Sequence, residues 1–261
     1  MVRKASQATF DNPCFLLESI FSLGLEPMER PIYRARVERI FDHCADTRSL
    51  FLQTQSGRLP RYSPGMFVSV TIPLANEVRV RPYTIATSPE DGEPFELCFN
   101  LVPNGPGAAW MFERKVGDLL NFTGPFGAFT LEGAPGRETV FIAEETAIAP
   151  IRPMLHRALA RPVVHPIHLL YAAHRSDHLL YRSELESLSR AYPQFGFEPL
   201  VVDDDSLYLR LLTEVQRRWV ASDSDRSRHF FVCGVGSGVL KLRDLLRQAG
   251  YERRAVRYEQ W

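Results

Sequence analysis

Three side chains with useful chemistry stand close together in the stretch Arg81-Pro82-Tyr83-Thr84. The guanidinium of Arg81 matches phosphate oxygens with a rigid fork of donors and keeps its charge at any ordinary pH. Tyr83 offers a large planar face, and Thr84 offers a hydroxyl. Because side chains alternate across a strand, Arg81 and Tyr83 share one side of the strand predicted to start here, and Thr84 takes the other. These residue types suit a phosphate and a planar ring, but four residues alone fit equally an Arg and a Tyr on an ordinary barrel face, so further motifs must decide.

A second candidate for phosphate binding is the glycine-rich turn within Val102 to Trp110 (VPNGPGAAW). It leads into a helical stretch predicted over Ala108 to Lys115. Backbone N–H groups at a helix N-terminus are a ready site for anions. Gly117-Asp118 and the corner Gly124-Pro125-Phe126-Gly127 follow, and both compositions are typical of turns.

The elements that must position these residues change character along the chain. From Tyr33 to Leu131, strand-like runs alternate with Gly, Pro and Asn, which predicts an antiparallel β-barrel. After Gly136, short apolar strands alternate with longer helical patterns, which predicts an α/β parallel sheet covered on both faces. The segment Leu131 to Glu138 is rich in Gly and Pro and is the natural boundary. We expect residues 1–32 to form an N-terminal extension, residues 33–135 the barrel and residues 136–261 the α/β domain.

The motifs of the barrel half together resemble those of the ferredoxin–NADP reductase superfamily. The resemblance implies that Arg81 pairs with the pyrophosphate of FAD, that Tyr83 lies on the isoalloxazine ring and that Thr84 hydrogen-bonds near flavin N5. Where the family commonly has Ser this chain has Ala108, so one hydrogen bond worth about 1 kcal/mol is missing. The FAD contacts implied by the resemblance are Arg81, Pro82, Tyr83, Thr84, Gly105, Gly107, Ala108, Ala109 and Trp261.

The resemblance extends into the second half, although one loop departs from the pattern. Phe141 to Pro150 (FIAEETAIAP) keeps Thr146 as a nucleotide contact, but Glu144 and Glu145 replace glycines that let a dinucleotide approach the backbone. We therefore expect weakened NAD(P)H binding. The alternative is that both Glu side chains point into solvent or cap the positive end of the following helix.

Three further segments carry residues that the resemblance places near NAD(P)H. His174, Arg175 and Arg182 stand where relatives recognise the adenosine end, or they are exposed charges of a loop and a helix start. Cys233 stands beside the nicotinamide in the family pattern, or it is a buried structural thiol. The chain closes on Tyr258-Glu259-Gln260-Trp261, similar to the family's Glu-x-aromatic ending, in which the aromatic ring covers the flavin; the other interpretation is that Trp261 plugs the core. The catalytic candidates are Thr84, Cys233, Glu259 and Trp261.

The composition is that of an ordinary globular protein. Hydrophobic residues make up 45% and charged residues 24% of 261 residues, and Lys plus Arg equals Asp plus Glu at 31 each, so nothing points to nucleic acid. The cysteines are too widely spaced for zinc or iron–sulfur patterns, and the histidines form no ligand cluster, so no metal site is predicted. A reduced, cytoplasmic location fits best. The four cysteines are Cys14, Cys44, Cys98 and Cys233.

The segment Cys14 to Leu25 (CFLLESIFSLGL) is apolar, but Glu18 interrupts it and no small-residue cleavage site follows. It is too short to span a bilayer, and its apolar positions roughly follow helical spacing. We expect a short amphipathic helix that either packs on its own chain or docks a partner.

The function that the resemblance implies is that of an FAD-dependent oxidoreductase moving electrons between NAD(P)H and a separate electron-carrier protein or redox partner subunit. The alternative is a flavin-binding assembly or electron-transfer subunit with a degenerate nicotinamide site, for which Glu144 and Glu145 are the main argument. A free-flavin reductase is disfavoured, because Arg81 and the glycine loop suit a tightly held FAD. The choice between NADH and NADPH, the electron acceptor and the oligomeric state stay open.

Overall fold

The computed structural model describes residues 31–57, 59–103, 105–131, 133–204, 206–222 and 224–261. The amphipathic helix expected over Cys14 to Leu25 lies outside these residues. Within the described part of the chain, none of the helices has the length and apolar character needed to cross a membrane.

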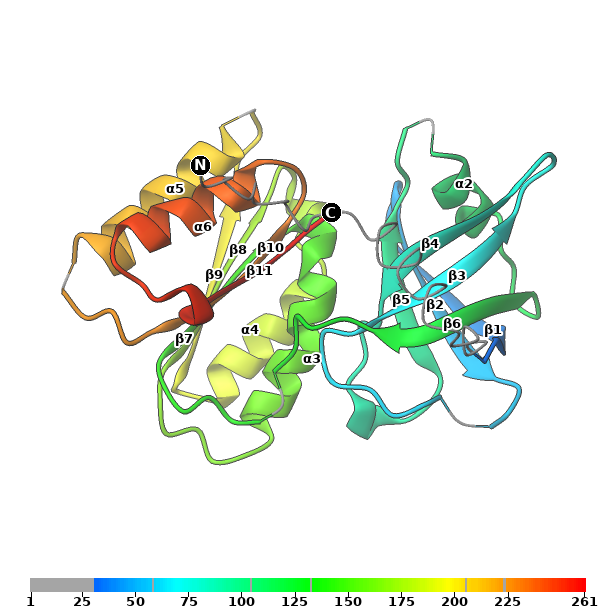
Figure 1. Cartoon of the computed structure of the whole chain (residues 1–261), viewed down its shortest axis with the longest axis horizontal. Helices are drawn as coiled ribbons and strands as arrows, with labels where there is room; N and C mark the ends of the chain where they lie inside the picture. The colour runs from blue at the N-terminus through cyan, green and yellow to red at the C-terminus, as the bar shows by residue number, and fades with distance from the viewer. Residues whose placement is uncertain (1–30, 58, 104, 132, 205, 223) are drawn as a thin grey trace, which may run out of the picture. The chain divides into compact units, whose positions relative to one another are not determined.

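The first half is an antiparallel sheet of six strands in the order β4-β3-β6-β1-β2-β5 (Figure 1). The sheet closes because the chain leaving β4 joins β5: Ile85 bridges Leu97, and the Ala86 N–H donates to the Glu96 carbonyl oxygen at 2.8 Å. The predicted antiparallel barrel is confirmed. Its strands are β1 (Tyr33–Cys44), β2 (Thr47–Thr54), β3 (Phe67–Pro73), β4 (Val78–Thr84), β5 (Phe95–Asn100) and β6 (Leu119–Phe126).

The helix of the barrel half, α2 (Pro106–Phe112), begins and ends earlier than the predicted Ala108 to Lys115. Pro106 occupies the first helical position, where its fixed φ suits the helix and its missing N–H costs nothing. The chain then turns at Gly117, whose φ of +95° falls in the region that favours glycine. A short 3-10 turn, η1 (Pro89–Asp91), lies between β4 and β5.

The second half is a parallel sheet in the order β11-β10-β7-β8-β9, as the alternation of strands and helices predicted. Helices α3 and α4 pack on one face and α5 and α6 on the other (Figure 1). The strands are β7 (Thr139–Glu144), β8 (Ile167–Ala173), β9 (Phe195–Val201), β10 (His229–Gly234) and β11 (Val256–Gln260). The helices are α3 (Ile148–Leu159), α4 (Arg182–Ala191), α5 (Leu207–Val215) and α6 (Gly238–Gln248).

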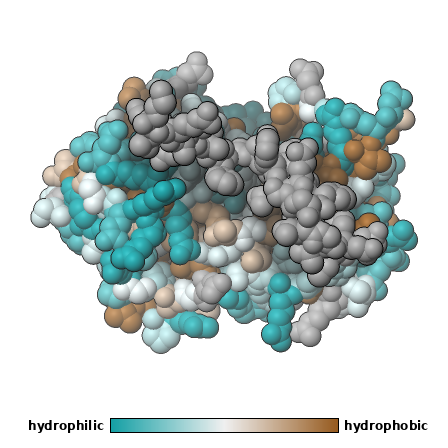
Figure 2. Space-filling view, viewed as in Figure 1, coloured by the Kyte–Doolittle hydropathy of each residue, from teal (hydrophilic) through white to brown (hydrophobic). Residues whose placement is uncertain are grey.

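Four short helical turns complete this half: η2 (Glu145–Ala147), η3 (Ser176–His178), η5 (Arg253–Ala255) and a π-helical turn, η4 (Gln216–Val220), that prolongs α5. Helix α6 buries Val239, Leu242 and Leu246 against the sheet, while Lys241 on its other side is exposed. Such amphipathic helices leave much of the visible surface over the α/β half hydrophilic (Figure 2).

The final strand β11 was not among the predicted elements. It pairs in parallel with β10, with Cys233 opposite Glu259 and Gly234 opposite Gln260. It is an edge strand in which only Val256 is buried, so it lacks the apolar run of the central strand β7. Its pairing fixes the position of the last residues.

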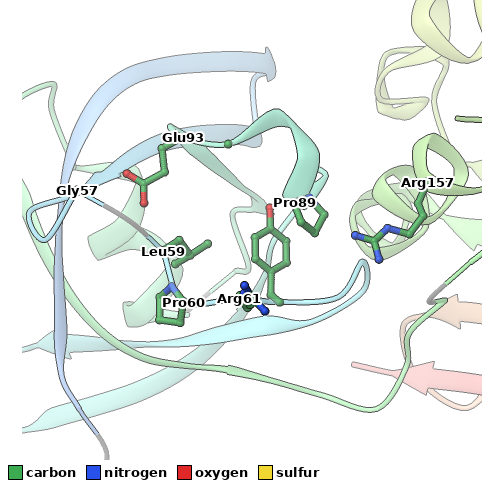
Figure 3. Close-up of a pocket in the computed structure, with 9 residues that line it drawn as sticks. Gly57, Leu59, Pro60, Arg61, Pro89, Glu93 and Arg157 are labelled. Carbon is green, nitrogen blue, oxygen red and sulfur yellow. The ribbon is translucent and has the colours of Figure 1, made fainter.

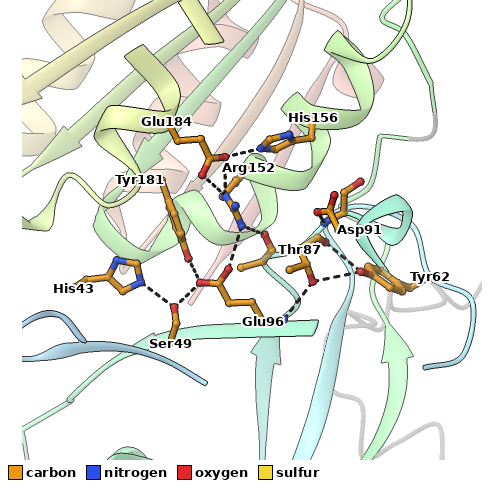
Figure 4. Close-up of polar contacts among 12 residues, drawn as sticks. His43, Ser49, Tyr62, Thr87, Asp91, Glu96, Arg152, His156, Tyr181 and Glu184 are labelled. Carbon is orange, nitrogen blue, oxygen red and sulfur yellow. Dashed lines mark hydrogen bonds and ion pairs between the residues drawn. The ribbon is translucent and has the colours of Figure 1, made fainter. Parts of the chain in front are cut away.

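A buried carboxylate connects the barrel to helix α3 and to the residue before α4 (Figure 4). Glu96 on β5 is 2% exposed, and its Oε2 pairs with Nη1 of Arg152 on α3 at 3.1 Å. The other oxygen, Oε1, accepts hydrogen bonds from Ser49 at 2.5 Å and from the Tyr181 hydroxyl at 2.7 Å. Arg152 also donates to the Ala86 carbonyl oxygen at 2.8 Å. Every polar atom of the Glu96 carboxylate therefore has a partner.

We expect Glu96→Ala to lower the free energy of unfolding by about 2 kcal/mol or more, because Ser49 and Tyr181 would lose their buried acceptor and Arg152 would keep only Glu184, at 2.9 Å, as an acidic partner. Urea unfolding followed by circular dichroism measures this loss. The matched control is Glu113→Ala, which removes an ion pair with Arg114 that spans 3.8 Å and involves a carboxylate 73% exposed. That control should cost less than about 1 kcal/mol. Equal losses for the two variants would contradict the importance given to Glu96.

Candidate functional site

A cavity of about 580 Å³ lies where the end of β4, the start of α2 and the end of β11 come together. It gathers most of the residues predicted to bind the flavin, and all of the last three residues line it. Ala109 is the exception, because it is exposed and lies outside the lining. The lining residues are Phe67, Arg81, Pro82, Tyr83, Thr84, Cys98, Phe99, Asn100, Val102, Gly105, Pro106, Gly107, Ala108, Glu259, Gln260 and Trp261.

The stretch Arg81 to Thr84 forms the end of β4, so the prediction that it starts a strand is wrong. Arg81 pairs with Val70 of β3, and Thr84 pairs with Phe67. One residue later the chain leaves β3, and Ile85 bridges to β5. The change of partner strand places the four residues at the mouth of the barrel, where they line the cavity.

Arg81 brings an unbalanced positive charge to this cavity. Its Nη1 donates to the Val80 carbonyl oxygen at 2.9 Å, and no carboxylate of the described residues lies within ion-pair distance of it. The start of α2 packs against it: a Cβ on Gly107 would stand 3.2 Å from Ile72 Cδ1 and 3.5 Å from Arg81 Cγ. No side chain caps the N-terminus of α2. Guanidinium and uncapped backbone N–H groups together suit a phosphate.

Tyr83 and Thr84 present an aromatic ring and a hydroxyl to the same space. The Tyr83 ring meets Phe99 edge to face, with centroids 5.4 Å apart and planes at 71°. Burial raises the pKa of Tyr83 to about 12, so its phenol stays neutral at physiological pH. Thr84 is 4% exposed, and no described residue hydrogen-bonds its hydroxyl. These groups suit a planar ligand with hydrogen-bonding edges.

The last residues supply the remaining wall of the cavity. The Trp261 N–H donates to the Gly234 carbonyl oxygen at 3.1 Å, and the indole Nε1 donates to Glu259 Oε1 at 2.8 Å. Burial raises the pKa of Glu259 above its ordinary value. Trp261 itself is 43% exposed, so it does not plug the core. Its indole therefore forms part of the open wall of the cavity.

Cys233 lies opposite Glu259 in the sheet, but it does not line the cavity that the other three catalytic candidates share. It is 2% exposed, belongs to the hydrophobic core with Phe141 and Phe231, and does not line the cavity. Burial raises the pKa of its thiol well above the ordinary value. The structural alternative for Cys233 fits these surroundings.

Several lining residues were missed by sequence reasoning, among them Phe67, Phe99 and Asn100. Strands were predicted between Tyr33 and Leu131, but which strands would be neighbours in the barrel was not. Closure of the barrel through Ile85 and Leu97 is what brings Phe99 to Tyr83. The signal available in the sequence was Phe99 itself, an aromatic residue near the end of a predicted strand.

A second polar cluster lies at the carboxyl edge of the parallel sheet, between β7 and β10. The strand order reverses at this point, where doubly wound sheets bind ligands. Here Oε2 of Glu144 accepts hydrogen bonds from the Val235 N–H at 3.1 Å and from the Tyr208 hydroxyl. Glu144 is 8% exposed. The Glu144 carboxylate thus accepts the Val235 N–H, a backbone donor that could otherwise bind a ligand phosphate.

Tyr208 was not anticipated, and two glycines make room for it. A Cβ on Gly238 would stand 2.2 Å from Tyr208 Cδ1, and one on Gly234 would stand 2.5 Å from the hydroxyl. Burial, with Glu144 as a further cause, raises the pKa of Tyr208. The signal available in the sequence was the pair Gly234 and Gly238, one at the end of the last apolar strand and one at the start of the next helix, which leave room for a large side chain.

Glu145 is also engaged within the chain. Its φ of 46° lies in the left-handed region, and Oε1 accepts hydrogen bonds from the backbone N–H of His174 at 3.2 Å. Nδ1 of His174 and Nδ1 of His178 each lie 3.1 Å from the same oxygen. Neither Glu144 nor Glu145 caps α3 or extends freely into solvent, so both parts of that alternative are wrong.

The residues predicted for the adenosine end follow the carboxyl ends of β7 and β8, outside the cavity described above. Thr146 is buried in η2. His174 contacts Glu145, Arg175 pairs with Asp177, and Nε of Arg182 lies 2.8 Å from Oε1 of Glu186. Each of the three basic side chains already has an acidic partner.

A larger hollow of about 650 Å³ lies elsewhere, between the loop after β2, η1 and α3 (Figure 3). None of the motif residues lines it. Two of its three charged lining residues bond within the protein: Glu93 accepts hydrogen bonds from the backbone and hydroxyl of Thr54 at 3.1 and 2.7 Å, and Arg157 pairs with Glu90 at 2.5 Å. The smaller cavity is therefore the candidate site.

Two family models match the chain. One is described as an oxidoreductase FAD-binding domain and matches residues 34–131; the other is an oxidoreductase NAD-binding domain and matches residues 141–240. Together the two matches span more than half of the chain, and each falls on one of the two sheets.

Among curated relatives, ferredoxin–NADP reductase B of Sorangium cellulosum is 25% identical over 237 residues, which are 88% of this chain and 97% of that protein. Methane monooxygenase component C of Methylosinus trichosporium is 33% identical over 145 residues, 55% of this chain and 42% of that protein. The toluate 1,2-dioxygenase electron transfer component of Pseudomonas putida is 28% identical over 177 residues, 67% of this chain and 52% of that protein. The chain thus spans only about half of the two oxygenase components.

Solved structures share the fold. The Amycolatopsis cytochrome P450 reductase GcoB superposes with a TM-score of 0.75 at 22% identity, over 90% of this chain and 71% of that one. A ferredoxin NADP+ reductase from Neisseria gonorrhoeae with bound FAD and NADP superposes with a TM-score of 0.73 at 16% identity, over 89% of this chain and 99% of that one.

We expect the double change Glu144→Gly and Glu145→Gly to strengthen NAD(P)H binding about tenfold or more. A carboxylate about 5 Å from a phosphate repels it by roughly 3 kcal/mol at an effective dielectric near 20, before salt screening. Removing half of this repulsion would raise the affinity for the nucleotide about tenfold. Titration calorimetry with each nucleotide, repeated at rising salt, measures the gain.

The single change Glu144→Gln separates charge from bulk, because it keeps an acceptor for the Val235 N–H and removes the charge. Exposed Glu113→Gln is the matched control and should leave the affinity unchanged. A double glycine variant that is less stable and binds no more tightly would contradict the expectation.

Proposed function

Because this chain belongs to the ferredoxin–NADP reductase superfamily and is an NAD(P)H-dependent flavoprotein reductase that uses FAD, we propose that it passes electrons to a separate electron-carrier protein. In this proposal residues 33–135 hold FAD and residues 136–261 hold the nicotinamide nucleotide. The names of the relatives support the direction of transfer: one is a ferredoxin–NADP reductase, and another is an electron transfer component of a dioxygenase.

The observation that carries the proposal is the cavity in which Arg81, Tyr83 and Trp261 meet. An unpaired guanidinium beside an uncapped helix start fits a pyrophosphate, and the aromatic walls fit a flavin ring. When bound, FAD accepts a hydride from a reduced nicotinamide and gives up electrons singly.

The chain's own residues bind and orient in this scheme. Arg81, with the backbone of Gly105 to Ala108, would hold the phosphates. Tyr83, kept neutral by burial, would stack on the ring, and the unbonded hydroxyl of Thr84 would hydrogen-bond to its edge. Glu259 holds the indole N–H of Trp261 at 2.8 Å, and so it positions the ring that must move when a nicotinamide enters.

A second candidate function has one observation in its favour. The Glu144 carboxylate already occupies the Val235 N–H at the crevice of the parallel sheet. A flavin-binding assembly or electron-transfer subunit with a degenerate nicotinamide site would tolerate this arrangement. It would receive its electrons from a protein instead of from NAD(P)H.

Anaerobic titration of the FAD-loaded protein with NADH and with NADPH separates the two functions. Flavin absorbance should bleach within turnover times with at least one nucleotide, and a one-electron acceptor such as an added ferredoxin should restore it. Flavin that bleaches with dithionite but with neither nucleotide would support the second candidate.

We expect Arg81→Ala to weaken FAD binding by about tenfold or more and FMN binding far less, because only FAD carries the pyrophosphate that a fork of donors can grip. Equilibrium dialysis of the apoprotein against each flavin measures both constants. Arg79→Ala is the matched control, since Arg79 lies on the same strand but pairs with Glu77. An equal loss for both flavins would show that Arg81 is not the phosphate clamp.

A further inference from the structure

Three potential metal ligands meet beside the β1–β2 turn: Sγ of Cys44, a carboxylate oxygen of Asp46 and a ring nitrogen of His178, all within 4.8 Å of one another. Cys44 Sγ lies 3.0 Å and His178 Nε2 lies 3.1 Å from Oδ1 of Asp46. The side chain of His178 is 13% exposed, and Asp46 opens to solvent. The cluster is reachable from solvent yet largely fixed.

These separations are close to those of a tetrahedral zinc site. With zinc bonds of about 2.3 Å to sulfur and about 2.0 to 2.1 Å to nitrogen and oxygen, neighbouring ligand atoms stand about 3.4 to 3.6 Å apart. The two distances to Asp46, 3.0 and 3.1 Å, would lengthen by about 0.3 to 0.6 Å. The distance between Cys44 Sγ and the ring nitrogen of His178, which is within 4.8 Å, would adjust to about 3.5 Å. Asp46 Oδ2 has no hydrogen-bond partner among the described residues, so it offers a second oxygen to the same position.

His178 has the carboxylate support that metal-binding histidines have. Its Nε2 faces the cluster, while its Nδ1 lies 3.1 Å from Oε1 of Glu145. Both ring nitrogens face carboxylates, since Nε2 lies 3.1 Å from Asp46 Oδ1, so a bound ion would take the place of the proton between Nε2 and Asp46. A carboxylate that accepts the Nδ1–H makes Nε2 a better ligand. Glu145 is itself held by two hydrogen bonds from His174.

The ligands stand on ordered elements. Cys44 ends β1, and Asp46 completes the two-residue turn before β2, where Cys44 pairs with Thr47. His178 ends the 3-10 turn η3 and donates its N–H to the Arg175 carbonyl oxygen at 3.1 Å. A site held in this way loses little conformational entropy when an ion binds.

We propose that Cys44, Asp46 and His178 bind a zinc ion, with Glu145 as the carboxylate that orients His178 and water as the fourth ligand. A thiolate, an imidazole and a carboxylate form the mixed ligand set that suits zinc. Binding releases the thiol proton that Cys44 otherwise donates to Asp46. The ion joins the barrel to the α/β half at a place distinct from the flavin cavity, so the proposal is independent of electron transfer.

The test uses the FAD-loaded protein, freed of metal with a chelator and kept reduced with a phosphine. Titration calorimetry with Zn2+ should show one ion per chain. Cys44→Ser and His178→Gln should each abolish that binding, and Glu145→Gln should weaken it by about 10- to 100-fold. Asp177→Asn and His165→Gln are matched controls, because they remove a carboxylate and a histidine outside the cluster and should bind as the parent does.

A second measurement needs no variant. Iodoacetamide should modify Cys44 at least tenfold more slowly when Zn2+ is present, and peptide mapping reads Cys44 separately from the other cysteines. Bound FAD reports that each variant is folded. Absence of Zn2+ binding by the parent protein, or binding retained by both Cys44→Ser and His178→Gln, would overturn the proposal.

Discussion

The pairing of Glu96 with Arg152 is the contact on which the arrangement of the described residues most depends. Removing two charges from water is costly, and mutual attraction offsets the cost only when further hydrogen bonds complete the site. Ser49, Tyr181 and the Ala86 carbonyl oxygen supply them. Because Ala86 lies two residues after the cavity-lining Thr84, the pair also fixes where the end of β4 leaves one strand for the next.

Hydrophobic periodicity was enough to predict most of the fold, because the central strands carry it strongly. Every residue of β7 is buried, and the sequence is correspondingly apolar. The pattern failed where a strand lies at an edge. In β4 the residues Val78 and Val80 are exposed and Pro82 removes a backbone donor, so the strand's beginning was missed. The polar run of β11 hid a strand for the same reason.

The flavin site was predictable where its chemistry is local and unpredictable where it depends on tertiary contacts. Arg81, Tyr83 and Thr84 occur within one stretch, so they carry the resemblance to the reductase superfamily, which implied a phosphate beside a flavin ring. Phe99 reaches that ring only through closure of the barrel. His178 lies 132 positions from Asp46, and no spacing rule for metal ligands connects residues so far apart.

The contact of Glu144 with Tyr208 also constrains how this protein can change over evolutionary time. Tyr208 fits only because Gly234 and Gly238 carry no Cβ, and its hydroxyl shares the Glu144 carboxylate with the Val235 N–H. A side chain added at Gly238 is excluded while Tyr208 is present, and loss of Glu144 leaves a half-buried phenol with fewer partners. Substitution at any of these positions changes the cost of substitution at the others, which is epistasis, so the order of mutations decides which nucleotide-binding crevices this lineage can reach.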